Sequence, residues 1–412
     1  MNKIIKHSFS QLYSMSSGIS STKEQAGHGS PFVSFSTVFN NYFLPDILPD
    51  LMDTSKQEQN IYSIKAGDIL ITRTSETIDE LAMSCVAAKN YPGATYSGFT
   101  KRLRPKTEGI AYHKYLAFYL RGKLFRKAVT NNAFMTLRAS FNEDIFSFLS
   151  LYLPEYKEQV KIGDMLYLME QKIQLNKSIC SELESMAKTL YDYWFVQFDF
   201  PDENGRPYRA SDGEMVWNPQ LKREIPKGWE SGKLSDIANI TMGQSPAGES
   251  YNETGDGMVF YQGRTDFGMR FPTTRMYTTA PTRFAHKGDI LLSVRAPVGD
   301  LNIAMEDCCI GRGLAALKSK VGSQMYVFYT LSGLKPIFDV MDGNGTTFGS
   351  ITKDTLFGLN VVIPTNFQLQ KFEKRVKPIE DQIQICEQEN RELIKLRDWL
   401  LPMLMNGQAQ VE

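Results

Sequence analysis

The chain has 412 residues, and its 46 Lys and Arg side chains equal its 46 Asp and Glu side chains in number. This length exceeds what a single hydrophobic core usually holds, so we expect two domains with connectors. No apolar run reaches the ~18 residues of a membrane helix, and residues 1–7 lack the apolar stretch of a signal peptide, which predicts a cytoplasmic protein without membrane contact. The 5 cysteines lack CxxC spacing and only 4 histidines are present, which argues against a metal site.

Residues 1–154 are the first expected domain. Within it, residues 63–72 predict a turn followed by a buried strand, and residues 115–129 have the apolar spacing of an amphipathic helix. Between residues 101 and 140, ten Lys or Arg stand against one acid, Glu108. Clustered Lys and Arg contact phosphates, and the planar fork of Arg can read guanine, although a solvated basic face gives the same pattern.

The segment 155–197 carries an apolar seam at alternating spacings of four and three residues, which is the heptad pattern of a coiled coil. The seam consists of Ile162, Leu166, Met169, Ile173, Asn176, Cys180, Leu183, Ala187, Leu190 and Trp194. A second seam in residues 365–407 consists of Phe372, Val376, Ile379, Ile383, Cys386, Asn390 and Leu393, after which Leu396 and Leu400 replace Arg397. Pro378 predicts a kink in this second helix or its true start.

The connector, residues 198–232, is rich in turn formers but contains Trp217 and Trp229. Aromatic residues on a connector usually dock, either on the chain's own helices or on a partner subunit.

Residues 233–364 repeat the first domain. The Gly-Asp-Ile-Leu sequence at 67–70 recurs at 288–291, and residues 136–154 are echoed without a gap by residues 346–364. Residues 326–338 predict the corresponding helix, and nine Lys or Arg stand against five acids between residues 261 and 320. Two similar α+β units, each followed by a long helix, predict an approximate two-fold axis and an antiparallel coiled coil. The alternative is that each amphipathic helix lies on its own domain.

Several segments resemble one known family, the specificity (S) subunit of type I restriction-modification enzymes, a class of phage-defence systems. The connector carries the resemblance most clearly, through 194–195, 198–201, 205–208 and 225–230. Residues 288–291 with Arg295, residues 345–347 leading to 363–364, and the tail 400–407 are similar too. Two features depart from the family pattern. The Ile-Pro-x-Gly-Trp entry of the second unit has no counterpart before the first, and Arg295 lies one position off Arg73 when the repeated strands are aligned, which predicts opposite faces for them.

The resemblance implies two target recognition domains, 1–154 and 233–364, each reading one half of a split duplex DNA sequence. It implies that the helices 155–197 and 365–407 form a coiled coil that spaces the half-sites. Two methyltransferase subunits would dock on the conserved regions, and motor-nuclease subunits would complete the complex. S-adenosylmethionine, ATP and magnesium would then bind to the partner subunits, and none of them to this chain.

We expect no catalytic residue in this chain. Asn218-Pro219 is followed by Gln220 instead of the Pro-aromatic pair that amino-methyltransferases use, and residues 343–347 lack the lysine of a phosphate-binding loop. The predicted DNA contacts follow strand ends in the repeated units: Arg73, Lys101, Arg102, Arg104, Arg138, Arg264, Arg270, Arg295 and Arg312. The predicted partner contacts are Trp194, Phe195, Trp217, Trp229 and Trp399.

The heptad labels predict that Asn176 faces Asn390 in one layer and that Cys180 faces Cys386 in the next. Two amides can satisfy each other's hydrogen bonds, so the pair should fix the register and the distance between half-sites.

Two other functions fit the same residues. The chain could be a complete methyltransferase or nuclease with unrecognised motifs, or a coiled-coil scaffold that joins proteins without specific DNA binding. Modification of DNA by the purified chain would identify the enzyme, and binding to duplexes that weakens steeply with salt would exclude the scaffold.

Overall fold

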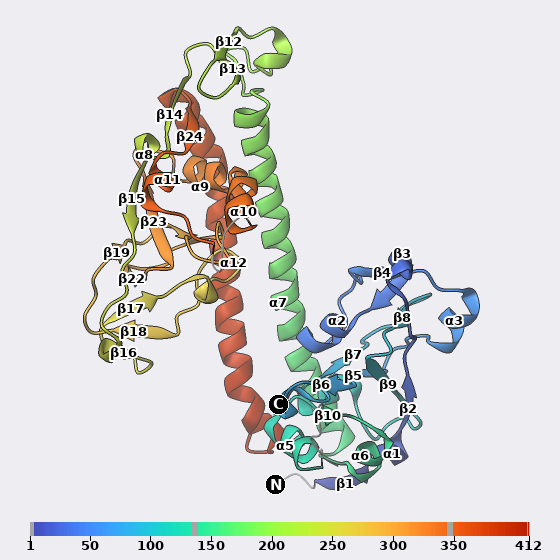
Figure 1. The fold of residues 1–412 in the computed structure, drawn as a ribbon. Coiled ribbons are helices and arrows are strands. Elements are labelled where there is room, and N and C mark those ends of the chain that lie inside the picture. Colours follow the sequence, from blue (N-terminus) through green and yellow to red (C-terminus); the bar gives the residue numbers. More distant parts are fainter. Residues whose placement is uncertain (1–3, 133–138, 344–348, 410, 412) are drawn as a thin grey trace. The chain divides into compact units, whose positions relative to one another are not determined.

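The computed structural model describes residues 4–132, 139–343, 349–409 and 411. The chain forms two compact units, unit 1 (Met1–Lys177 with Glu387–Glu412) and unit 2 (Ser178–Cys386). The two longest helices, α7 (Tyr156–Tyr191) and α12 (Asn366–Met405), each contribute residues to both units (Figure 1). The two units divide each long helix between them and do not separate it as a segment of its own. The predicted division of the chain into five segments stays a prediction.

Unit 1 is built on a four-stranded antiparallel sheet of strand order β2-β9-β5-β7. Its strands are β1 (Ile5–Ser8), β2 (Tyr13–Ser17), β3 (Ala26–Val33), β4 (Asp50–Met52), β5 (Ile69–Thr72), β6 (Thr74–Ser75), β7 (Ser84–Val86), β8 (Thr95–Tyr96), β9 (Thr100–Pro105), β10 (Ala139–Ser140) and β11 (Ser150–Leu153). Its shorter helices are α1 (Phe9–Leu12), α2 (Phe35–Asn40), α3 (Lys56–Ile61), α4 (His113–Tyr119), α5 (Lys123–Asn132) and α6 (Glu143–Phe148). A three-stranded sheet, β4-β3-β8, and the pairs β1-β11 and β6-β10 complete it.

The predicted buried strand is confirmed as β5. All four of its residues are buried, because the sheet has a core on each face: Ile69 and Ile71 pack on one side and Leu70 on the other. A short apolar run without polar alternation is the pattern of a strand that is covered on both faces.

Unit 2 repeats this architecture with a sheet of order β15-β23-β20-β21. Its strands are β12 (Met215–Asn218), β13 (Arg223–Pro226), β14 (Glu230–Lys233), β15 (Ala238–Met242), β16 (Tyr251–Asn252), β17 (Met258–Tyr261), β18 (Met276–Thr278), β19 (Phe284–Ala285), β20 (Ile290–Ser293), β21 (Leu301–Ile303), β22 (Cys308–Ile310), β23 (Leu314–Ser319) and β24 (Asn360–Ile363). Its shorter helices are α8 (Leu234–Ile237), α9 (Gln324–Gly333), α10 (Lys335–Gly343) and α11 (Lys353–Phe357). Strands β16 to β19 and β22 form a second sheet, β14 pairs with β24, and β12 with β13 forms a hairpin in the connector.

The two units share the four-stranded sheet and the elements that lead into and out of it, whereas their second sheets have three strands in unit 1 and five in unit 2. In each, a strand leads through a one-turn helix into the edge strand of the four-stranded sheet, as β1-α1-β2 and as β14-α8-β15. The strand that precedes the long helix then pairs with the first of these, β11 with β1 and β24 with β14. The internal repeat predicted from the sequence is therefore present in the fold.

Two helix predictions need correction, and one of two alternatives for a third is excluded. The helix predicted for 115–129 is two helices, α4 and α5, separated at Leu120–Gly122, and the helix predicted for 326–338 is likewise α9 and α10. Helix α12 begins at Asn366 and continues through Pro378, so the proline does not mark its start. Pro378 lies on the exposed face of the helix, where water can satisfy the carbonyl that the proline leaves without a donor.

The long helices run antiparallel within each unit, as predicted. In unit 1, Leu404 near the end of α12 shares a core with Ile162 near the start of α7. In unit 2, Phe372 near the start of α12 lies 4.9 Å, between ring centroids, from Phe195, which follows α7. Among the described residues, no helix is long and apolar enough to cross a membrane.

The predicted break in the second seam at Arg397 is wrong. Arg397 stays on the buried face, where its Nη1 donates to Oε2 of Glu170 at 2.9 Å, and its side chain is only 12% exposed. Of the two predicted replacements, Leu396 is 45% exposed, whereas Leu400 is partly buried and packs against the core of unit 1. A buried carboxylate on the facing helix makes the arginine compatible with the seam.

Candidate nucleic-acid interface

Each four-stranded sheet presents one corner at which its buried central strand ends and the neighbouring strand begins. In unit 1, Thr72 at the end of β5 pairs with Thr100 at the start of β9, so Arg73 and the turn Ser97–Thr100 lie together. The Arg73 N–H donates to the carbonyl oxygen of Phe99 at 2.8 Å. We call this region the β5/β9 corner.

The matching region of unit 2 is the β20/β23 corner. Ser293 at the end of β20 pairs with Leu314 at the start of β23, and the Val294 N–H donates to the carbonyl oxygen of Gly313 at 2.9 Å. The turn Gly311–Leu314 packs against two other loops at backbone distance. A Cβ at Gly243 would lie 2.2 Å from the carbonyl oxygen of Gly311, and one at Gly313 would lie 2.7 Å from that of Gln262. Glycine is therefore needed where these loops meet.

The corners carry exposed cations. Arg73, Arg295 and Arg312 are all exposed, and within the described part of the chain none of them forms an ion pair. Burial lowers the pKa of Lys101, and the nearby Arg73 lowers it further. The Lys101 ammonium group donates one hydrogen bond to Oγ of Ser17 at 2.8 Å. Unpaired guanidinium groups on a rigid strand end can donate to phosphates or base edges.

The expected non-equivalence of Arg73 and Arg295 agrees with the hydrogen-bond pattern. The counterpart of Arg73 is the buried Val294, because both donate to the turn of the neighbouring strand. Arg295 instead bridges Ser350, as Thr74 bridges Ser140 in unit 1. The two arginines therefore reach the surface from successive positions of an extended segment, whose side chains alternate in direction.

Two predicted contacts in unit 1 are bound internally. Arg102 is 9% exposed and donates through Nη1 to the carbonyl oxygen of Ser63, while Arg104 pairs with the buried Asp68 at 2.6 Å and donates to the same carbonyl. The burial of Arg102 contradicts its predicted contact with DNA. The guanidinium of Arg104 is held by its ion pair with Asp68.

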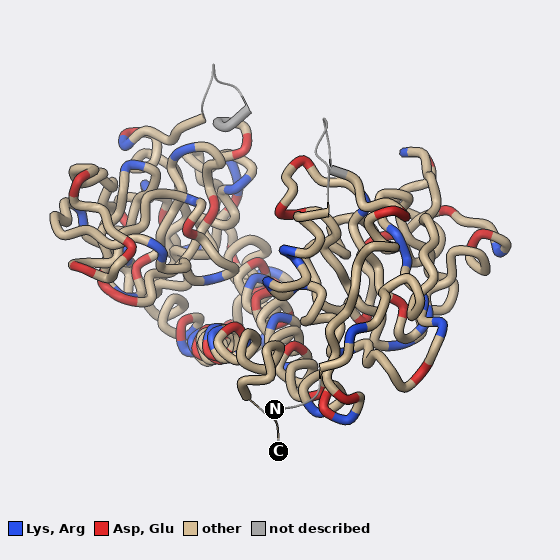
Figure 2. Tube along the Cα trace, turned by 90° about the horizontal axis from the view of Figure 1, so that it is seen from below, with Lys and Arg blue, Asp and Glu red and all other residues tan. Residues whose placement is uncertain are grey.

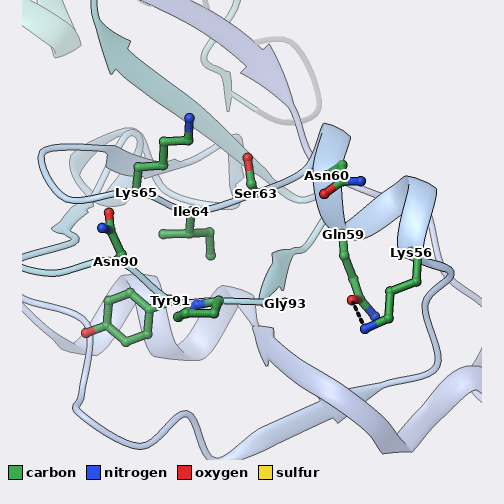
Figure 3. Close-up of a pocket in the computed structure, with 10 residues that line it drawn as sticks. Lys56, Gln59, Asn60, Ser63, Ile64, Lys65, Asn90, Tyr91 and Gly93 are labelled. Carbon is green, nitrogen blue, oxygen red and sulfur yellow. Dashed lines mark hydrogen bonds between the residues drawn. The ribbon is translucent and has the colours of Figure 1, made fainter.

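The Ser63 carbonyl belongs to a segment that borders an open pocket of about 580 Å³, which is lined by Lys56, Gln59, Asn60, Ser63, Ile64, Lys65, Asn90, Tyr91, Pro92 and Gly93 (Figure 3). Within the pocket Lys56 donates to Gln59 at 3.1 Å. These residues precede β5 or follow β7, whereas Arg73 follows β5, so pocket and corner lie at opposite ends of that strand.

Arg270 is also a wrong prediction. Its side chain is 3% exposed, and it lies between two carboxylates of the long helices, with Nε 3.3 Å from Glu184 and Nη2 3.4 Å from Glu380. Tyr329 donates to Glu380 at 2.9 Å, and the guanidinium lies over the ring of Phe328, 4.2 Å from its centroid. Arg270 therefore anchors its loop to the helices of unit 2 and has no surface left for DNA.

The other predicted contact of this loop, Arg264, is exposed but pairs with Asp300 at 2.6 Å. Arg138 lies outside the described residues. Figure 2 shows Lys, Arg, Asp and Glu positions distributed along the trace of both units. Much of the positive charge of residues 101–140 is bound to protein atoms within unit 1. Arg121, for example, donates to four backbone carbonyls.

Residues at the corners that the sequence did not single out are Phe99, Gln244, Gln262 and Arg283, all of them exposed. Phe99 is 66% exposed on a tight turn beside Arg73. Gln244 and Arg283 are brought near the β20/β23 corner because Ile310 donates to Arg283, and Gln244 to Ile310. The sequence Ser-Gly-Phe before a basic strand could have indicated an exposed turn at Phe99. The positions of Gln244, Gln262 and Arg283 depend on contacts between loops that are distant along the chain, which no local pattern predicts.

The repeat and the fold match one family. The sequence matches the family model described as Type I restriction modification DNA specificity domain twice, over residues 16–185 and 226–395. The chain belongs to this family. Its two matched segments are offset by 210 residues, from 16 to 226, which is also the offset between residues 136–154 and 346–364.

Two curated relatives come from Methanocaldococcus jannaschii. The chain is 30% identical over 406 residues to a putative type I restriction enzyme MjaX specificity subunit, covering 96% of this chain and 91% of the relative. It is 25% identical over 383 residues to the type I restriction enzyme MjaIX specificity subunit, covering 88% and 82%. A solved structure, the type I restriction-modification S subunit from M. genitalium, shares the fold with a TM-score of 0.62 at 17% identity, covering 98% of this chain and 96% of that one.

In this family member the predicted contact between Asn176 and Asn390 is present. Nδ2 of Asn176 donates to Oδ1 of Asn390 at 3.0 Å, and both residues are buried. The two amides do not satisfy each other fully, because Nδ2 of Asn390 donates to the carbonyl of Ile173 and Oδ1 of Asn176 has no partner among the described residues. Cys180 and Cys386 lie in one buried cluster. That these residues fix the register stays a prediction.

The predicted partner contacts separate into two groups. Trp194, Phe195 and Trp229 are at most 6% exposed and belong to the core of unit 2, so burial contradicts their assignment to a partner. The connector docks instead on its own unit, where Trp229 packs against Phe195 with 5.8 Å between ring centroids. Trp217 and Trp399 are 62% and 65% exposed, and their partner role stays a prediction.

Proposed function

We propose that each unit reads one half of a bipartite duplex DNA sequence, with the β5/β9 corner and the β20/β23 corner as the contact surfaces. One observation carries this proposal: the same strand framework occurs twice, and at the same corner of each copy it presents exposed arginines in different positions. A shared frame with unlike side chains suits two half-sites of different sequence. Membership of the DNA specificity family supports this assignment.

We propose further that the chain binds DNA without modifying it. Catalysis would reside in two methyltransferase subunits and in motor-nuclease subunits, which would hold S-adenosylmethionine, ATP and magnesium, while this chain would need no cofactor. The exposed Trp217 and Trp399 are the residues best suited to dock these partners, since large exposed aromatic side chains commonly anchor interfaces. The paired helices α7 and α12 would then set the spacing between the half-sites.

The decisive experiment measures duplex binding by the purified full chain at a series of salt concentrations. Contact with several phosphates predicts a log-log salt slope of roughly −0.9 for each phosphate neutralised. Incubation of the same protein with DNA and either S-adenosylmethionine or magnesium should leave the DNA unmodified. A salt-independent interaction would favour a protein scaffold, and modified DNA would show that the chain is itself an enzyme.

A further inference from the structure

The turn that precedes the second strand of each corner has the same closing hydrogen bond in both units but different exposed side chains. In unit 1 the Thr100 N–H donates to the carbonyl of Ser97 at 2.9 Å, and in unit 2 the Leu314 N–H donates to that of Gly311 at 3.0 Å. Each pattern closes a four-residue β-turn. The central residues are Gly98 and Phe99 in one unit and, in the other, Arg312 followed by glycine.

A second contact confirms that these turns are equivalent. A Cβ added at Gly18 would lie 2.2 Å from the carbonyl oxygen of Ser97, and a Cβ added at Gly243 would lie 2.2 Å from that of Gly311. In both units, therefore, the loop after the edge strand packs against the turn at backbone distance, and a glycine makes that approach possible.

The unit 1 turn is held rigidly. The Ser97 N–H donates to Val33 at 3.0 Å, the Gly98 N–H donates to Ile19 at 2.7 Å, and the Phe99 N–H donates to Oγ of its neighbour Ser97 at 3.2 Å. The Phe99 carbonyl in turn accepts from Arg73. With its backbone fixed in this way, Phe99 projects an aromatic side chain, 66% exposed, beside two cations, Arg73 and Lys101.

We propose that this turn sets one base preference in each half-site. Phe99 packs against the C5-methyl group of a thymine, and Arg312 donates to O6 and N7 of a guanine. The thymine methyl is the apolar group that the major groove offers, and a two-donor arginine contact with guanine is the commonest specific one. This assignment rests on the proposed DNA-recognition function and adds to it the chemistry of one position in each half.

The test uses the full chain and the duplex that it enriches from a random library. Single thymines of the first half-site are replaced by deoxyuridine, which lacks the methyl group. The wild-type protein should lose about fourfold in affinity at one position, the effect of one buried methyl group. Phe99→Ala should bind the intact duplex more weakly and show no penalty at that position, while Phe99→Leu should keep the penalty. Phe148→Ala, which removes a phenylalanine that is 75% exposed at the end of α6, is the matched control and should behave as wild type.

The second arm replaces single guanines of the other half-site by 7-deazaguanine, which lacks the N7 acceptor. Wild type should lose affinity at one guanine, and Arg312→Ala should lose that sensitivity. Identical deoxyuridine penalties in wild type and Phe99→Ala, or a first half-site without any sensitive thymine, would overturn the assignment of Phe99. A uniform loss of affinity in Phe99→Ala with the penalty intact would point to a wedge between bases and would also overturn it. Failure of the full chain to bind any duplex would instead refute the proposed function.

Discussion

Replacing Arg270 by methionine should destabilise unit 2 by about 3–5 kcal/mol, because it leaves buried carboxylates without their partner. The arginine side chain is 3% exposed, and of its two partners Glu380 is 11% and Glu184 is 32% exposed. Most of the cost should come from Glu380, since water can still reach Glu184. Methionine preserves the length of the side chain, so the loss measures charge more than packing.

The same substitution should make stability depend on pH. Burial already raises the pKa of Glu380 and of Glu184 in the folded protein, with attraction to Arg270 opposing it. Removing Arg270 should raise both further. A carboxyl whose pKa is higher in the folded state binds a proton more strongly there. The loss of unfolding free energy in Arg270→Met, relative to wild type, is therefore largest above the folded-state pKa. This loss of stability shrinks as the pH falls toward about 4.3, the ordinary pKa of a glutamate.

Urea unfolding of the full chain at pH 8 and pH 5.5 measures both effects. Arg270→Met combined with Glu380→Gln should recover much of the loss at pH 8, since the amide carries no charge. The control is Lys377→Met, which removes an exposed pair with Asp381 on the same helix and should cost at most ~0.5 kcal/mol. A deficit for Arg270→Met that equals the control, or that is the same at both pH values, would refute the buried-charge account.

Three further predictions concern recognition and spacing. Asn176→Leu alone should cost roughly 1–3 kcal/mol in urea unfolding, because it leaves the buried Oδ1 of Asn390 without its donor, whereas replacing both asparagines should restore stability; equal losses in single and double variants would contradict this. Exchanging residues 233–364 for the matching unit of a relative should change one half of the selected sequence, and a change in both halves would argue against modular reading. Inserting four residues at a matching point in one long helix should lengthen the gap between half-sites, and an unchanged gap in a folded, active complex would show that the helices do not set it.

The repeat and the seams were readable from the sequence because they depend on local period and on order along the chain. The buried strand β5, the antiparallel pairing of the helices and the Asn176 to Asn390 contact all follow from such patterns. Boundaries were harder to predict. The break at Leu120–Gly122 interrupts a run of buried residues that looks continuous, and Pro378 is tolerated because it faces solvent.

The basic residues show what composition cannot reveal. Arg102, Arg104 and Arg270 lie in the basic segments of the sequence, yet each is bound to a carbonyl or carboxylate that is distant along the chain. Their partners depend on long-range pairing, which no local pattern records. Arg73 and Arg312 differ from them because they follow or precede a strand at an exposed corner, and that position, more than charge, marks them as candidates.

The central claim, that one chain reads two separate half-sites, is tested most directly by selection from a random duplex library with the full chain, followed by sequencing of the bound pool. We expect an enriched sequence in two specific halves separated by a gap of fixed length and free composition. We also expect that alanine at Arg73 relaxes positions in one half only and that alanine at Arg312 relaxes positions in the other half only. A single continuous sequence, or variants that relax the same half, would contradict this claim.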